Sequence, residues 1–240
     1  VVLDGFDLGV GILHPFARTD HERRIFLNAI GPVWDGNEVW LVVLGGALFA
    51  GFPHAYATIM SAFYIPVMIF LAGLIFRAVS IEFRSKRESK TWRGMWDGIF
   101  ALGSFVIAFG LGFVLGNMIE GIPLTETDEF AGTFSELVSP FTIVTGFFMV
   151  ALTMMHGAIY LVMKTEGELH EKLRHWVNRS IIFFLLMYVV VTCLTLIYLP
   201  HMTERFRDHP WVFFVVIVGL LALANVPREI NKKRDGFAFI

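Results

Sequence analysis

The Lys and Arg residues of this chain are confined to alternate polar gaps between long apolar stretches. Seventeen of the 19 lie in the gaps after the first, third, fifth and seventh stretches, and the other gaps are almost free of them. Loops that stay on the cytoplasmic side of a membrane accumulate Lys and Arg, whereas a soluble fold gives no reason for such sorting. The pattern predicts a polytopic membrane protein whose odd-numbered spans run inward, so that the observed N-terminal end faces outside.

The composition agrees with a membrane protein and excludes several other classes. The 240 residues are 56% hydrophobic and 17% charged, whereas soluble proteins carry about 25% charge. Cys193 is the single cysteine, so an internal disulfide or a cysteine-based metal site is excluded. The net charge of -2 argues neither for nor against nucleic acid, but no basic patch is interleaved with aromatic residues as in a binding groove, so we expect no nucleic-acid partner.

The apolar stretches are long enough to be membrane-spanning helices, which need about 20 residues each. A capping box, Thr19-x-x-Glu22, predicts the start of the second helix, and Pro32 predicts a kink within it. We expect a tight turn at Pro53-His54. About seven spans are predicted, at residues 1–16, 19–52, 55–79, 95–118, 139–163, 176–199 and 210–226. The fold class is therefore all-α, a polytopic transmembrane helical protein. The sequence starts inside an apolar stretch and ends on another, so we expect it to be part of a longer chain.

Four carboxylates fall within or near the first two spans: Asp4, Asp7, Asp35 and Glu38. An acid at the bilayer centre costs about 2.5–3.5 kcal/mol, so such groups usually face protein or water and often have a function. Asp7 lies 11 residues before Arg18, and Asp35 lies 11 residues after Arg24, so both are about 16 Å from a basic anchor. We expect these acids to meet at one depth and to carry protons from the cytoplasm. The alternative is that they only link helices or contact a partner subunit.

Two further residue types inside the spans require an interpretation. His156 is a candidate axial ligand for haem iron, but a lone histidine within a span is more often a hydrogen-bonded packing residue, so we expect no metal site here.

Gly5 and Gly9 have the spacing that allows close helix approach. Gly45-Gly46 and Gly110-x-Gly112 lie in apolar stretches rather than after strands, so we expect close helix packing there and not nucleotide binding.

Several motifs occur in an order that is specific to one family. They are Asp4-Gly-Phe-Asp-Leu-Gly-Val-Gly11, Glu22-Arg-Arg24, Gly31-Pro-Val-Trp-Asp-Gly-Asn-Glu-Val-Trp40, Phe83-Arg-Ser-Lys86, Trp92-x-x-Met-Trp-Asp97 and Gly167-Glu-Leu169. With these motifs the chain resembles subunit II of the cytochrome bd-type terminal quinol oxidases over essentially its whole length.

The resemblance implies a role in a respiratory enzyme of the prokaryotic cell (inner) membrane. That enzyme oxidises quinol and reduces dioxygen to water, generating a proton gradient. Haem b and haem d are carried by subunit I, while subunit II is haem-free, supports assembly and provides a proton route and an oxygen route. The resemblance leaves open a bound quinone and a small single-span accessory subunit. It also implies two four-helix bundles plus one extra helix, here residues 1–118, an external acidic loop at 119–138, and a truncated second bundle at 139–240.

The resemblance also assigns roles to particular residues. Asp35 is the strongest candidate for proton transfer, Asp4 and Asp7 fill the family's two aspartates of span 1, and Glu38 joins them. Trp34, Asn37 and Trp40 are implied to line a channel or the subunit interface, and no catalytic residue is expected in this chain.

Two other functions are compatible with the residues. A proton-coupled transporter would use the same intramembrane carboxylates, and Pro32 and Gly36 give the second span the character of a broken helix at a transport site. An assembly scaffold would carry the acids without using them.

Overall fold

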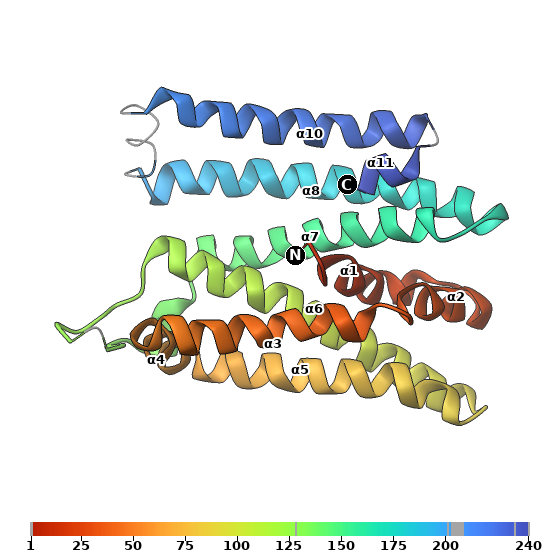
Figure 1. The fold of residues 1–240 in the computed structure, drawn as a ribbon, viewed down its shortest axis with the longest axis horizontal. Coiled ribbons are helices and arrows are strands. Elements are labelled where there is room, and N and C mark those ends of the chain that lie inside the picture. Colours follow the sequence, from red (N-terminus) through yellow and green to blue (C-terminus); the bar gives the residue numbers. More distant parts are fainter. Residues whose placement is uncertain (1, 128, 201, 203–208, 233, 240) are drawn as a thin grey trace.

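The computed structural model describes residues 2–127, 129–200, 202, 209–232 and 234–239, and these residues are mainly helical (Figure 1). The α-helices are α1 (Gly5–Leu13), α2 (Asp20–Ile30), α3 (Trp34–Gly51), α4 (Pro53–Ala62), α5 (Tyr64–Phe83), α6 (Lys90–Glu120), α7 (Pro140–Met163), α8 (Gly167–Tyr198), α10 (Phe213–Asn231) and α11 (Asp235–Phe239). Short 3-10 turns are η1 (His14–Phe16), η2 (Arg84–Lys86), η3 (Phe134–Leu137) and η4 (Pro210–Val212). In the described residues the β-type pairing is limited to one isolated bridge, Leu124 to Phe130.

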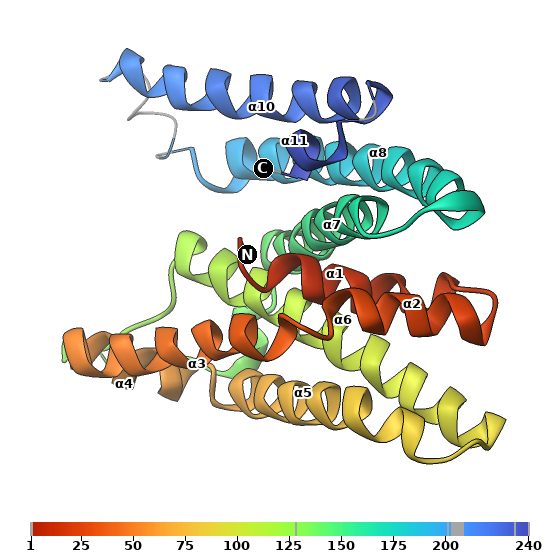
Figure 2. The same ribbon diagram turned by 45° about the vertical axis from the view of Figure 1, so that its right-hand side comes forward.

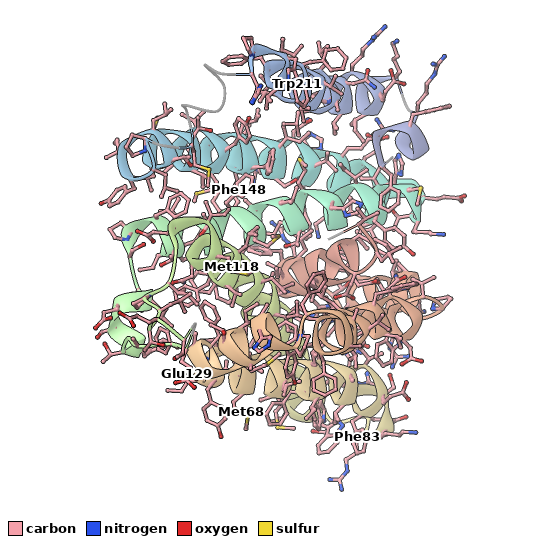
Figure 3. The ribbon with its side chains drawn as sticks, turned by 60° about the vertical axis from the view of Figure 1, so that its left-hand side comes forward. Met68, Phe83, Met118, Glu129, Phe148 and Trp211 are labelled. Atoms are coloured by element: carbon pink, nitrogen blue, oxygen red, sulfur yellow. The ribbon has the colours of Figure 1, made fainter. Side chains whose placement is uncertain are left out.

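Within the described residues, five helical segments are long and apolar enough to cross a membrane. They are Tyr64–Lys86, Lys90–Glu120, Pro140–Met163, Gly167–Tyr198 and Pro210–Ile230. These segments overlap the third to seventh predicted spans, so the all-α polytopic fold class is confirmed. Large apolar side chains cover their outer surface, among them Met68, Met118 and Trp211 (Figure 3).

The second predicted span is broken into two helices, whereas only a kink was expected. Its predicted start is confirmed, because the Thr19 hydroxyl accepts a hydrogen bond from the Glu22 backbone N–H at 3.1 Å. Helix α2 ends at Ile30 and α3 begins at Trp34, so residues 31–33 form a turn between two separate helices. Pro32 lies in this turn, where its missing N–H and its ring prevent a continuous helical hydrogen-bond ladder.

The third predicted span is also two helices rather than one. Phe52 alone separates α3 from α4, and Pro53 is the first residue of α4, so the tight turn expected at Pro53-His54 is wrong. Proline is favoured at the first helical position because its N–H would have no partner there. Phe63 divides α4 from α5. Helix α4 is seen nearly end-on in Figure 1, so it lies across the direction of α3 and α5.

The sorting of basic residues along the sequence becomes a sorting between the two ends of the molecule. Helix α2, the α5–α6 turn, the α7–α8 turn and the C-terminal end of α10 all lie at one end, on the right in Figures 1 and 2. We call this the basic end. The acidic connection between α6 and α7 lies at the opposite end. Arg205, Arg207 and Lys233 lie outside the described residues.

Helix α1 is short but central, because it packs against both α6 and α7. A Cβ added to Gly9 would lie 1.9 Å from the Thr153 backbone oxygen and 2.9 Å from the Gly157 Cα. The close approach predicted for Gly9 is therefore confirmed. The division into two bundles at residues 119–138 stays a prediction, and α1 and α7 pack together across it.

Helix α3, unlike α1, is not covered by the described part of the chain. No residue of α3 is buried by the described part of the chain. No described atom lies within 4 Å of a Cβ added to Gly45 or Gly46. The close packing expected at this glycine pair is therefore not supplied by the described chain, whereas Gly112 of α6 does meet the backbone of α7.

Candidate functional site

A buried polar cluster joins α1, α3 and α5. The Arg77 side chain of α5 is 0% exposed, donates a hydrogen bond to the Glu38 carboxylate, and lies 3.7 Å from Asp4 Oδ1. Asn37 Nδ2 donates a hydrogen bond of 2.7 Å to Asp7 Oδ2. We call these five residues the Arg77 cluster. Polar contacts thus hold the start of α3 against α1 and α5.

The Arg77 cluster leaves several buried polar atoms without a hydrogen-bond partner among the described residues. These atoms are both carboxylate oxygens of Asp4, Oδ1 of Asp7, and Nε and Nη2 of Arg77. Buried polar atoms are normally hydrogen-bonded, either to protein or to ordered water. One guanidinium also balances only one of the three carboxylates. Carboxylates in such surroundings are of the kind that often has a function at membrane depth.

Asp35 lies at the rim of this cluster rather than inside it. It is exposed in the first turn of α3, three residues before Glu38 and therefore near the same helix face. Asp7 bonds to Asn37 and not to Asp35. The structure thus groups Asp4, Asp7 and Glu38, and leaves Asp35 facing outward.

The two tryptophans of the same motif have different surroundings. Trp34 is partly buried and packs against the main hydrophobic core. Trp40 is 57% exposed, on the part of α3 that the described chain leaves uncovered.

Arg77 was missed from the sequence. The 17 basic residues assigned to alternate gaps include Arg77, and for Arg77 this assignment is wrong, because it is buried within α5. A usable signal was present, since Arg77 stands alone in the apolar run Leu74-Ile-Phe-Arg-Ala-Val79. An isolated arginine inside a span is expected to pair with an acid.

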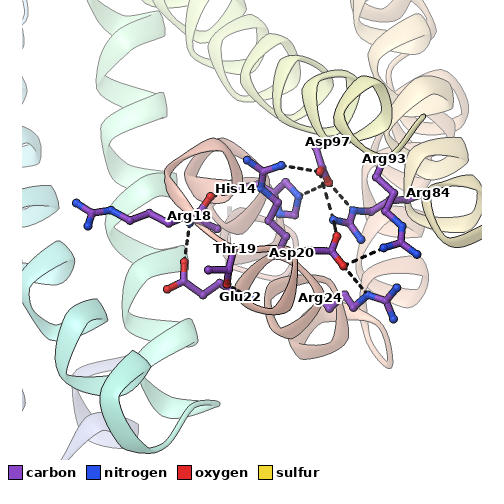
Figure 4. Close-up of polar contacts among 11 residues, drawn as sticks. His14, Arg18, Thr19, Asp20, Glu22, Arg24, Arg84, Arg93 and Asp97 are labelled. Carbon is purple, nitrogen blue, oxygen red and sulfur yellow. Dashed lines mark hydrogen bonds and ion pairs between the residues drawn. The ribbon is translucent and has the colours of Figure 1, made fainter. Parts of the chain in front are cut away.

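A second polar cluster lies at the basic end, around Asp97 of α6 (Figure 4). His14 Nε2 lies 2.6 Å from Asp97 Oδ1, and Arg84 Nε donates to the same oxygen at 2.5 Å. Arg23 Nη1 donates to Asp97 Oδ2 at 3.0 Å. One carboxylate therefore ties η1, α2, η2 and α6 together.

Asp20 extends this cluster toward solvent. It accepts hydrogen bonds from Arg84 at 2.7 Å, from Arg24 at 3.1 Å and from Arg93 at 3.1 Å. The hydrogen bond from Arg84 is the main reason that the pKa of Asp20 is below its usual value. The sequence identified Asp97 only as part of a motif, and gave no sign of its contact with His14.

The two clusters flank α1. His14 follows Asp7 by seven residues, which is about 10 Å along a helix. Between them, a Cβ added to Gly11 would lie 1.9 Å from Ser104 Oγ. The hydroxyl of Ser104 therefore lies beside α1, between the Asp97 cluster and the Arg77 cluster.

His156 lies in an aromatic cluster. Its ring stacks on Phe239 with centroids 4.6 Å apart, and it contacts Phe6 edge-on at 5.6 Å. This is the environment of a packing residue. The described residues contain no group of three or more His, Cys, Asp or Glu that could hold a metal ion.

Comparison with known proteins gives consistent matches. Residues 1–240 match the family described as cytochrome bd terminal oxidase subunit II. Cytochrome bd-I ubiquinol oxidase subunit 2 of Escherichia coli (strain K12) is 47% identical over 180 residues, which cover 72% of this chain and 47% of that protein. Cytochrome bd ubiquinol oxidase subunit 2 of Bacillus subtilis (strain 168) is 34% identical over 238 residues, which cover 99% of this chain and 70% of that protein. The chain thus spans about half the length of the Escherichia coli relative.

A solved structure has the same fold. The structure of bd oxidase from Geobacillus thermodenitrificans matches with a TM-score of 0.78 and 18% identity, covering 99% of this chain and 74% of that one.

Proposed function

Because the chain belongs to the cytochrome bd terminal oxidase subunit II family, we propose that it acts within a membrane complex that oxidises quinol and reduces dioxygen to water. Its partner is a subunit I that carries haems b and d, which supply electron transfer and oxygen reduction when bound there. This chain is haem-free, is not catalytic alone, and supports assembly of the complex. It lies in the prokaryotic inner membrane, with the basic end in the cytoplasm and the observed N-terminal end toward the outside.

The contribution of this chain to turnover is a proton route. Protons enter at the basic end near Asp97 and His14, and pass Ser104 beside α1. They then reach the Arg77 cluster, where Asp4, Asp7 and Glu38 lie together, and leave through Asp35. The observation that carries this proposal is the set of buried carboxylate oxygens of Asp4 and Asp7 without a partner among the described residues. Such atoms are suited to a hydrogen-bonded water chain.

The exit of this route is the face of α3 that the described chain leaves uncovered, where the partner subunit would bind. Asp35 and Trp40 are exposed on α3, and Gly45-Gly46 is open. Small residues permit close approach of a neighbouring membrane helix. An acid on this face is also better placed against protein than against lipid.

The second half of the chain contains an apolar cavity that would suit the apolar ring and tail of a bound quinone. An apolar cavity of about 590 Å³ lies between α6, α7, α8 and η4, with Leu115, Phe148, Val191 and Trp211 among its lining residues. This volume is within the usual range for small-molecule sites.

The proton route is tested with Asp7→Asn and Asp35→Asn in the full-length subunit, co-expressed with its partner. Quinol-dependent oxygen consumption, proton uptake and haem content are measured. Loss of a proton-transfer group costs roughly 10²-fold or more in rate, so both variants should be slow with normal haem content. Glu129→Gln, in the acidic connection at the opposite end, is the matched control and should be fully active.

Other outcomes distinguish the alternatives. Normal turnover and proton uptake in Asp35→Asn would remove Asp35 from the route. If the chain were only an assembly scaffold, the variants would lower the haem content of the complex and leave the rate per haem unchanged. A transporter would purify as a colourless stable monomer that moves solute in vesicles. The turn at residues 31–33 has the form of a broken transport helix, and family membership favours the oxidase.

A further inference from the structure

A second cavity, of about 410 Å³, lies between α1 and α8 at the basic end. Its lining contains three cationic side chains, Arg18, Lys172 and Arg179, while most of the remaining lining is apolar. None of these three residues belongs to the Arg77 cluster or contacts Asp97. We call this cavity the α1–α8 cavity.

The cationic side of the α1–α8 cavity carries uncompensated charge. Lys172 Nζ donates to both carboxylate oxygens of Glu22 at 2.9 Å. The side chains of Arg18 and Arg179 form no ion pair or hydrogen bond with another described residue. Figure 4 shows Arg18 directed away from the Asp97 cluster, toward α7 and α8. Three cations and one carboxylate leave a net charge of about +2.

The apolar side of the cavity lies deeper in the molecule than the cations. Helix α1 runs toward the basic end, and its Leu13 comes before Arg18. Helix α8 runs away from that end, and its Phe183 comes after Arg179. On both walls the cation is therefore nearer the end of the molecule and the apolar side chain nearer its middle.

The cations also lie at the depth of lipid headgroups. Helix α8 has 32 residues, about 48 Å, which exceeds a hydrocarbon thickness of about 30 Å. From Arg179 to the end of α8 at Tyr198 the length is about 28 Å, so Arg179 lies at the edge of the hydrocarbon. Trp176 lies one turn closer to the end, where interfacial tryptophans are favoured. Its ring forms an edge contact with Phe16 at 6.1 Å.

We propose that the α1–α8 cavity binds an anionic phospholipid. Arg18 and Arg179 hold its phosphate, and an acyl chain lies along Leu13, Met154 and Phe183. Basic pockets between membrane helices suit such headgroups, and the charge of about +2 favours an anionic over a zwitterionic lipid. Free phosphate would leave the apolar side of the cavity unused. The proposal is independent of the oxidase activity, because none of its residues is in the proton route.

The test uses the full-length complex purified from membranes and stripped of lipid with detergent. Cardiolipin, phosphatidylglycerol, phosphatidylcholine and inorganic phosphate are added separately, and binding is followed by native mass spectrometry and thermal shift. The two anionic lipids should bind and raise the Tm. In Arg18→Gln/Arg179→Gln their affinity should fall about 30-fold, about fivefold for each charge removed.

Two control variants separate this site from general surface charge. Arg18→Lys/Arg179→Lys keeps both charges and should bind within about threefold of the unmodified complex. Lys86→Gln/Lys90→Gln removes two exposed charges at the same end but outside the cavity, and should bind normally. Equal weakening in the Lys86/Lys90 and Arg18/Arg179 glutamine variants would overturn the proposal. So would binding of phosphatidylcholine as tight as that of the anionic lipids, or full stabilisation by phosphate alone.

Discussion

Replacing Arg77 by methionine should destabilise this protein more than any surface substitution. Methionine keeps much of the length of the side chain and removes its charge. The Arg77 guanidinium is fully buried, donates to Glu38 and faces Asp4. Its loss leaves the three carboxylates of the Arg77 cluster without a cation.

The size of the effect follows from this burial. Breaking a buried ion pair by removing one partner costs about 3–5 kcal/mol, because the remaining charge stays desolvated. For a chain of this size, 1 kcal/mol shifts the Tm by about 2–4 °C. Arg77→Met should therefore lower the Tm by about 6–20 °C. Lys86→Met, an exposed basic residue just beyond α5, should change stability by less than about 0.5 kcal/mol.

A double-mutant cycle with Glu38→Met tests the reasoning directly. Thermal unfolding of the purified complex is measured for both single variants and for the double variant. Replacing a buried pair by apolar groups is often close to neutral, so the double variant should be clearly more stable than the sum of the single effects predicts. Additivity within about 0.5 kcal/mol would show that the two residues do not interact. A loss below about 1 kcal/mol in Arg77→Met would also refute the reasoning.

Three other substitutions have expected outcomes. Gly9→Ala should lower the Tm of the complex, because its Cβ would lie 1.9 Å from a backbone oxygen of α7 and overpacking costs about 1–3 kcal/mol; Gly94→Ala, in open space on α6, is the control. Gly46→Leu should reduce co-purification with the partner subunit, and undiminished recovery would place the interface elsewhere. The hydrogen bond from Arg84 lowers the pKa of Asp20 from 3.8, so the stability it provides is complete above that pH and is lost as the pH falls through the lowered pKa. Asp20→Asn should therefore weaken the fall in Tm as the pH drops below about 4, and an unchanged acid profile would contradict this.

The sequence was sufficient for the fold class because long apolar stretches and sorted cations both report on the membrane. The sequence was not sufficient to predict that the helices end at residues 31–33 and at Phe63. Phe63 lies between apolar neighbours, and hydropathy does not distinguish a continuous helix from two short ones. Pro32 did mark the first break, but proline is tolerated in many membrane helices, where it produces a kink.

The sequence predicted the acidic residues of the candidate site but not the residues that they contact. Asp4, Asp7 and Glu38 stood out because carboxylates are rare at membrane depth. Their cation, Arg77, lies 39 residues from Glu38 along the chain, and the sorting of basic residues groups it with the following loop although it falls within the predicted span 55–79. The contact of His14 with Asp97 joins residues 83 apart. Pairings at such distances depend on which helices pack together, which one sequence without relatives does not specify.

In the proposed complex, the face of α3 that the described residues leave uncovered would make the biogenesis of this chain depend on its partner subunit. A newly inserted copy would present Asp35 and an open glycine pair to acyl chains until a second polypeptide arrives. Unassembled molecules would then be the ones most exposed to membrane proteases and chaperones. Cells that make the two chains in unequal amounts should therefore accumulate only as much of this one as they can pair.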